Sequence, residues 1–357
     1  MRRRGPTPWP RFALLGLGMS VLVVGIAGGL LRLGWPLPVP LAAAWHGPLM
    51  LCGFFGVVIG LERAVAVGQA WAYGSPVFSG LGAWALLAGQ AQLGFAGFAL
   101  GSAVLLAATV AAARRQPEPF MGVLALAVVA ALFGQGLWWL GAPLRAGLLP
   151  AFAFLVLTIT AERLELSRYV PRPPQAAPLL AVIVLALLAA LALPEPWDAH
   201  AFGLGLVALA AWLGAWDLAR NTVRQRGLPR FVAVALLLGY VQLLAAGLLL
   251  ARCGLQAGTA SYDAALHALG LGFIFSMVFG HAPVIAPAVL RVQLRYHAVL
   301  YLPLAVLHAS LLLRGAGLAL EQPALRRQSG LVSAVAIGSF VLLLVLLNLF
   351  KRSRRSH

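Results

Sequence analysis

Twelve apolar runs follow one another along the chain, separated by short stretches rich in Gly, Pro and Arg. They fall near residues 12–34, 42–62, 75–92, 94–113, 120–141, 146–165, 176–193, 200–219, 231–250, 263–282, 297–314 and 330–350. Runs of about 18 residues or more are long enough to cross the bilayer core as helices. Helices also satisfy their own backbone hydrogen bonds, which lipid cannot do. The pattern therefore predicts an all-α, polytopic membrane bundle of about twelve transmembrane helices.

We expect one integral membrane domain over residues 1–357. Residues 1–11 form a cytoplasmic N-terminal segment, residues 12–350 hold the helices, and residues 351–357 form a basic cytoplasmic tail. The first apolar run follows an Arg-rich segment, as in a signal peptide. However, it is longer than a typical signal-peptide core, and no small-residue cleavage site follows it directly. We therefore expect this run to be retained as the first helix.

Composition excludes a soluble globular domain. The chain is 62% hydrophobic and only 10% charged, whereas about a quarter of the residues of a soluble domain are charged. The formal net charge of +17 does not indicate nucleic-acid binding, because the basic residues lie between the apolar runs and form no patch or arm. The lipid bilayer is the expected partner.

The positions of the basic residues predict the orientation. With the N-terminus in the cytoplasm and twelve alternating helices, 20 of the 26 basic residues fall on the cytoplasmic side. The six on the outer side are Arg32, Arg145, Arg252, Arg314, Arg326 and Arg327. Cytoplasmic loops of membrane proteins carry an excess of Lys and Arg. We therefore expect both termini in the cytoplasm, with the chain in a bacterial inner membrane.

Three histidines are expected near the outer ends of three helices: His46, His267 and His308. Met50 lies four residues after His46 and therefore on the same helix face. Ionisable groups within a membrane are costly and are functional candidates by default. Neutral imidazole is a common ligand of heme iron and of copper. The pattern therefore indicates heme or metal binding if these side chains converge.

His281 lies at the opposite end of the helix that begins near His267. Pro283 and Pro287 follow it and are expected to bend or end that helix. His281 is therefore either a ligand of a second site or a cap at the cytoplasmic end. Asp263, four residues before His267, is placed to accept a hydrogen bond from the imidazole of His267.

Other polar groups point to structural roles. Glu62–Arg63 and Glu162–Arg163 lie at expected cytoplasmic helix ends, where we expect ion-paired caps. Cys52 and Cys253 are about 200 residues apart with no CxxC motif, which argues against a thiolate metal site. The sequence identifies no catalytic residue and leaves open whether the protein is an enzyme.

Two segments around the histidines resemble the NnrS family of heme- and copper-containing membrane proteins of the nitric-oxide response. The first segment matches at His46, Met50, Gly53, Phe54, Val58 and Ile59, and the second at His267, Ala268, Leu269, Gly272, Met277, Gly280 and His281. The resemblance implies heme as a cofactor, for which His46, His267 and His281 are the expected ligands. It also implies copper, for which His308 and Met50 are the candidate ligands by their positions on the helices. It also implies a membrane electron-transfer partner. The chain departs from the family at Pro48, where a second His is common. Its Gly280–His281 pair also follows His267 about two helical turns earlier than the corresponding pair in the family.

The architecture is also similar to that of the catalytic subunit of heme–copper oxidases. His46 and His267 lie on the second and tenth expected helices, which carry the low-spin heme ligands of those oxidases. The sixth and seventh expected helices contain no histidine, so the copper site of an oxidase cannot be assembled and oxygen reduction is not expected. Two further interpretations remain: a transporter or channel with a broken helix at residues 280–287, and a scaffold whose histidines only join helices.

Overall fold

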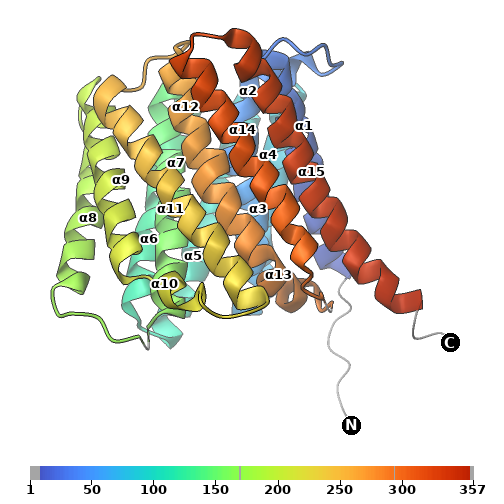
Figure 1. Ribbon diagram of the computed structural model, residues 1–357, viewed down its shortest axis with the longest axis vertical. Coiled ribbons are helices and arrows are strands. Elements are labelled where there is room, and N and C mark those ends of the chain that lie inside the picture. The colour runs from blue at the N-terminus through green and yellow to red at the C-terminus, as the bar shows by residue number, and fades with distance from the viewer. Residues whose placement is uncertain (1–8, 169, 293, 354–357) are drawn as a thin grey trace.

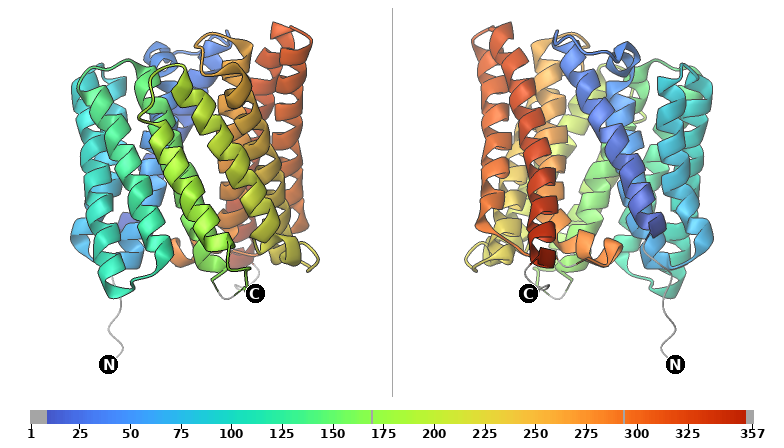
Figure 2. Two further views of the ribbon diagram at one scale, coloured as in Figure 1. Left: turned by 90° about the vertical axis from the view of Figure 1, so that its left-hand side faces the viewer. Right: turned by 90° about the vertical axis from the view of Figure 1, so that its right-hand side faces the viewer.

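The computed structural model describes residues 9–168, 170–292 and 294–353, and all regular secondary structure within them is helical. The helices run side by side through the height of one bundle (Figures 1 and 2). Helices α1 (Trp9–Arg32) and α15 (Pro323–Ser353) begin and end, respectively, at the same end of the bundle (Figure 1). We call this the basal end, and the opposite one the distal end.

Ten helices of the described chain are long and apolar enough to cross a membrane, so the protein is a multi-pass membrane protein. In addition to α1 and α15, they are α2–η1–α3 (Pro40–Val67), α5 (Ala91–Arg115), α6 (Pro119–Trp139), α7 (Leu144–Leu166), α9 (Trp197–Trp216), α11 (Leu228–Cys253), α12–η3–α13 (Ala260–Leu290) and η4–α14 (Ala298–Ala319). Each coincides with an apolar run of the sequence. The all-α membrane fold is thereby confirmed.

The other two predicted spans are present as shorter helices. Helix α4 (Gly74–Leu87) has 14 residues and α8 (Ala176–Ala190) has 15. At 1.5 Å per residue they extend about 21–22 Å, which is less than the roughly 30 Å of a bilayer core. Two short pieces, η2 (Ala70–Tyr73) and α10 (Ala219–Thr222), complete the described helices. The structure thus supports ten spans by length, rather than twelve.

Close helix packing depends on small residues. A Cβ atom added at Gly203 of α9 would lie 2.7 Å from the carbonyl oxygen of Gly247 in α11. A Cβ added at Gly134 of α6 would lie 3.0 Å from the carbonyl oxygen of Gly147 in α7. Glycine at such positions lets membrane helices approach backbone to backbone. Large apolar side chains remain on the outside, such as Leu312, which is 72% exposed; this surface suits lipid.

Two of the long helices contain a π-helical segment near their distal ends. The segment η1 (Leu49–Phe54) follows α2 (Pro40–Pro48) and precedes α3 (Phe55–Val67). The segment η3 (Ala268–Phe275) follows α12 (Ala260–His267) and precedes α13 (Ser276–Leu290). Pro48 has no N–H to donate and crowds the preceding turn, which explains a wider turn starting at Leu49. Such π segments often occur at functional sites.

Candidate functional site

A cavity of about 400 Å³ lies in the distal half of the bundle. Its walls come from α1, α2, α7, α12, α14 and α15, and most of the lining side chains are apolar. The polar groups on its walls include two histidines, His46 and His267, and three arginines, Arg32, Arg314 and Arg326. Cofactor pockets are typically apolar cavities of about 300–1,000 Å³ with a few convergent polar groups. This cavity has those properties.

His46 packs against α1, where it makes a hydrogen bond and where glycine residues leave room for its ring. Its Nδ1 lies 2.7 Å from the carbonyl oxygen of Gly25. Because a carbonyl only accepts, Nδ1 carries the proton and donates it. A Cβ added at Gly29 would lie 2.8 Å from Cε1 of His46. The imidazole therefore occupies space that only a glycine at position 29 leaves open.

His267 is oriented by Asp263, as the sequence predicted. Its Nδ1 lies 2.7 Å from the carbonyl oxygen of Asp263 and 3.2 Å from the Oδ1 of the same residue. The other carboxylate oxygen of Asp263 accepts a hydrogen bond of 2.5 Å from Arg314 of α14 (Tyr301–Ala319). The N-terminus of α12 is capped by Thr259, whose hydroxyl oxygen accepts from the backbone N–H of Tyr262 at 3.2 Å. The imidazole orientation thus depends on contacts between α12 and α14.

The two imidazoles lie close together and nearly parallel. The ring centroids of His46 and His267 are 6.2 Å apart and the ring planes differ by 13°. In both rings Nδ1 is bonded to a backbone carbonyl. Within the described chain, neither Nε2 has a hydrogen-bond partner. In a neutral imidazole with its proton on Nδ1, Nε2 is the nitrogen that can bind a metal.

The charged groups on the cavity wall are mostly positive. Arg314 is only 3% exposed, and its Nε has no hydrogen-bond partner in the described part of the molecule. Arg32 and Arg326 also line the cavity, whereas Asp263 is the only acidic lining residue. Arg314 is paired with Asp263, so Arg32 and Arg326 are the arginines that give the cavity wall a net positive charge, which suits an anionic group.

Met50 lines this same cavity. A Cβ added at Gly25 would lie 2.6 Å from the sulfur of Met50, so glycine at position 25 makes room for the thioether next to α1. The structure thus brings together His46, His267 and Met50, three of the five residues that the sequence singled out.

His308 does not join them, so of the three histidines at this depth only His46 and His267 line the cavity. Its Nε2 lies 2.9 Å from the hydroxyl of Ser276 in α13, and it does not line the cavity. The physical reason is the phase of α14. Six residues separate His308 from Arg314, and it is Arg314 that reaches the cavity.

His281 belongs to a separate cluster near the basal end. Its Nδ1 donates to the carbonyl oxygen of Met277 at 2.8 Å, and its Nε2 lies 3.4 Å from a guanidinium nitrogen of Arg163. Arg163 also makes a two-point ion pair with Asp217, with N···O distances of 2.9 and 3.1 Å. The side chains of Arg163 and Asp217 are only 4% and 1% exposed. Both ring nitrogens of His281 are thus engaged by the protein.

This cluster also corrects the expected cap at residues 162–163. Arg163 pairs with Asp217, which follows the end of α9, and not with its sequence neighbour Glu162. We assigned no functional role from the sequence to Asp217, or to Gly25, Gly29 and Arg314 around the cavity. Arg314 carries a usable signal, because an arginine at the end of an apolar run is a functional candidate.

Metal coordination by a larger set of ligands is not supported. Within the described residues, no group of three or more His, Cys, Asp and Glu side chains is placed to hold a metal ion. Cys52 and Cys253 are both free. A ligand held by this site would therefore depend on the two imidazoles, and Met50 adds a thioether to the same wall.

Comparison with known proteins gives a family but no characterised relative. No curated protein and no solved structure matches the chain. Residues 11–349 match the family described as "Domain of unknown function (DUF8744)". Because this match covers nearly the whole chain, the protein belongs to the DUF8744 family.

Proposed function

We propose that this multi-pass membrane protein binds heme, with His46 and His267 as the two axial ligands, in a bacterial inner membrane. The observation that carries the proposal is the pair of nearly parallel imidazoles on the wall of an apolar cavity, 6.2 Å apart between centroids. Both rings use Nδ1 for a backbone carbonyl and leave Nε2 without a protein partner.

The separation of the rings fits a metal bound between them. A nitrogen–metal bond of imidazole is about 2.0 Å, and the nitrogen lies about 1.1 Å from its own ring centroid. The centroids of the two stacked rings are 6.2 Å apart, which would place both imidazoles within reach of one metal ion. The fixed tautomers also agree, because metal-bound histidines usually donate their other ring N–H to a carbonyl or carboxylate.

The rest of the cavity fits a porphyrin better than a bare ion. A single ion needs far less than the 400 Å³ present. The apolar walls suit the macrocycle, and Arg32 and Arg326 suit its carboxylate groups. The excess of arginines over acidic residues on the cavity wall is the observation that favours an anionic partner.

Copper is the second candidate, and one observation favours it. Met50 lines the cavity together with both histidines, and imidazole with thioether is a donor set that suits copper. A copper ion would use His46, His267 and Met50, and would leave Arg32 and Arg326 on the wall without an anionic ligand.

Heme held by His46 and His267 would supply one-electron transfer, with a membrane electron-transfer partner as the source or acceptor of the electron. The residues of this chain hold the two imidazoles in place, and the apolar walls and arginines would surround the macrocycle and its carboxylates. Together with the resemblance of both histidine segments to the NnrS family, this supports a role in the response to nitric oxide.

The test is a pyridine-hemochrome assay and a visible spectrum of the purified protein. Wild type is compared with His46→Ala and His267→Ala. His200→Ala is the matched control, because His200 of α9 also binds a backbone carbonyl, that of Ala251 at 2.8 Å, but lies outside the cavity. We expect about one heme per chain in wild type and in the control. Either cavity variant is expected to lose heme or its six-coordinate, low-spin spectrum.

Full retention of the low-spin spectrum by both cavity variants would refute the assignment. Metal analysis of the same samples separates the two candidates. If wild type contains copper without heme, and Met50→Leu loses that copper, the site is a copper site and not a heme site.

A further inference from the structure

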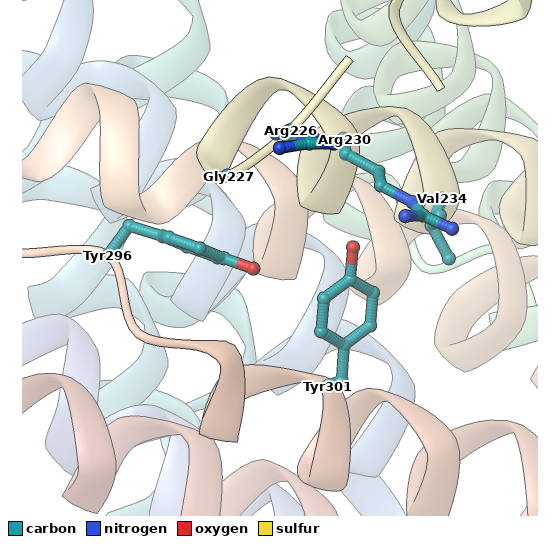
Figure 3. Close-up of a pocket in the computed structure, with 6 residues that line it drawn as sticks. All are labelled: Arg226, Gly227, Arg230, Val234, Tyr296 and Tyr301. Carbon is teal, nitrogen blue, oxygen red and sulfur yellow. The ribbon is translucent and has the colours of Figure 1, made fainter. Parts of the chain in front are cut away.

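A second pocket, of about 320 Å³, lies at the basal end of the bundle, far from the histidine cavity. It is formed by the loop that leads into α11 and by the segment that leads into α14. Its lining residues are Arg226, Gly227, Arg230, Val234, Tyr296 and Tyr301 (Figure 3). None of them was singled out from the sequence.

Two of the lining residues carry positive charge without an acidic counterpart. Arg226 and Arg230 are exposed and lie on either side of Gly227, the residue before α11. Gly227 has φ 71°, a conformation that favours glycine and turns the chain between the two arginines. All nine acidic residues lie in the described parts of the chain, and none of them is within ion-pair distance of Arg226 or Arg230. The pocket therefore favours an anion.

Two tyrosine hydroxyls face the same space from the other side. Figure 3 shows the hydroxyl oxygens of Tyr296 and Tyr301 directed toward the region between them and Arg230. The rings are held by the fully buried Phe231, whose centroid is 5.2 Å from that of Tyr301 and 6.0 Å from that of Tyr296. The pocket thus presents two guanidinium groups and two hydroxyl groups on positioned side chains. Guanidinium groups are well suited to the oxygens of a phosphate.

The depth of the pocket indicates where that phosphate comes from. Two candidate spans begin at its walls, Leu228–Cys253 and Ala298–Ala319. The pocket therefore lies at the level of the lipid headgroups. On the same two helices, Val241 and Leu302 are each 62% exposed, which gives acyl chains an apolar surface. Tyrosines are also enriched at this level of membrane proteins.

We propose that this basal pocket binds the phosphate of an anionic phospholipid headgroup. The two arginines bind the phosphate oxygens and the tyrosine hydroxyls donate to them, while the acyl chains lie against α11 and α14. The site acts independently of the histidine cavity, and its test does not depend on heme. Basic pockets between helices on the cytoplasmic side are a recurring form of anionic-lipid recognition.

Native mass spectrometry of the delipidated full-length protein in detergent tests this site. Phosphatidylglycerol is titrated against phosphatidylcholine with the same acyl chains, and against inorganic phosphate as competitor. The variant is Arg226→Gln with Arg230→Gln. The control is Arg220→Gln with Arg224→Gln, which removes the same charge from the preceding α10 segment, outside the pocket.

Each arginine near a membrane surface contributes an effect of about fivefold in lipid affinity. We therefore expect phosphatidylglycerol to bind the pocket variant about thirtyfold more weakly than wild type. The control and wild type should bind alike, and Tyr296→Phe with Tyr301→Phe should weaken binding severalfold while keeping the fold. Phosphatidylglycerol binding at wild-type strength in the arginine variant, or equal losses in both arginine variants, would overturn the proposal. Displacement of phosphatidylglycerol by inorganic phosphate at equal concentration would show that the pocket binds free phosphate and not a lipid headgroup.

Discussion

The substitution Gly29→Ala is a direct probe of how α1 holds His46. The added Cβ would lie 2.8 Å from Cε1, 3.1 Å from Nδ1 and 3.3 Å from Nε2 of the imidazole. Carbon atoms in contact prefer separations of about 3.5 Å or more. The ring must therefore move by about 0.7 Å or rotate away. Either movement breaks or strains the 2.7 Å hydrogen bond from Nδ1 to the carbonyl oxygen of Gly25.

The magnitude follows from the steric overlap. Overpacking a filled site costs about 1–3 kcal/mol. In the protein without cofactor, His46 relieves the overlap by rotating into the cavity, so the folded state loses little. A bound cofactor requires the ring in its original position, and the cost then appears as lost affinity. We expect hemin to bind about 5- to 150-fold more weakly.

Hemin titration of the purified protein, followed by absorbance, measures this effect. Gly16→Ala is the matched control, because it makes the same change on the same helix where an added Cβ would meet no atom within 4 Å. Both substitutions favour helix formation to the same extent. The difference between them therefore isolates the contact with His46. Thermal unfolding without hemin checks that both variants fold.

Equal hemin affinity in Gly29→Ala, Gly16→Ala and wild type would refute the reasoning. It would mean either that His46 is not a ligand or that its ring does not lie against Gly29. Retention of heme by His46→Ala distinguishes the first case from the second.

Three further substitutions test other parts of the structure. Asp217→Asn should lower the free energy of unfolding by about 3–5 kcal/mol, because it leaves the buried charge of Arg163 unpaired; an unchanged melting temperature would show that water screens the pair. Gly203→Ala should destabilise the protein by about 1–3 kcal/mol, because its Cβ would press into the backbone of α11, whereas Gly214→Ala on the same helix meets nothing within 4 Å and should be neutral in thermal unfolding. His308→Gln should leave hemin affinity within about twofold of wild type, since His308 bonds Ser276 outside the cavity; a large loss would return His308 to the site.

The sequence predicted the helices better than it predicted their lengths. Every apolar run coincides with a helix, because an unpaired backbone in lipid is too costly to leave any alternative. However, α4 and α8 are shorter than the runs that predicted them. Proline and glycine at their ends stop a helix before hydropathy falls. Composition alone does not locate those ends.

For the site, the sequence identified which residues carry chemistry but not which of them meet. His46 and Met50 share one helix face by their spacing, and Asp263 lies one turn from His267 for the same reason. These local relations were predictable because helical periodicity fixes them. The exclusion of His308 was not, because it depends on the rotation of α14 about its own axis.

The sequence by itself determined that this chain is a helical membrane protein. Hydropathy and helical backbone hydrogen bonding depend only on residues that are close together in the sequence. It also marked His46 and His267 as costly residues in an apolar setting. Only the tertiary structure decided that these two imidazoles lie nearly parallel on one cavity wall, and that Arg314 and Gly29 belong with them. Which helices become neighbours depends on many small contacts spread over distant segments, such as glycines that admit a facing backbone. No single stretch of sequence contains that information.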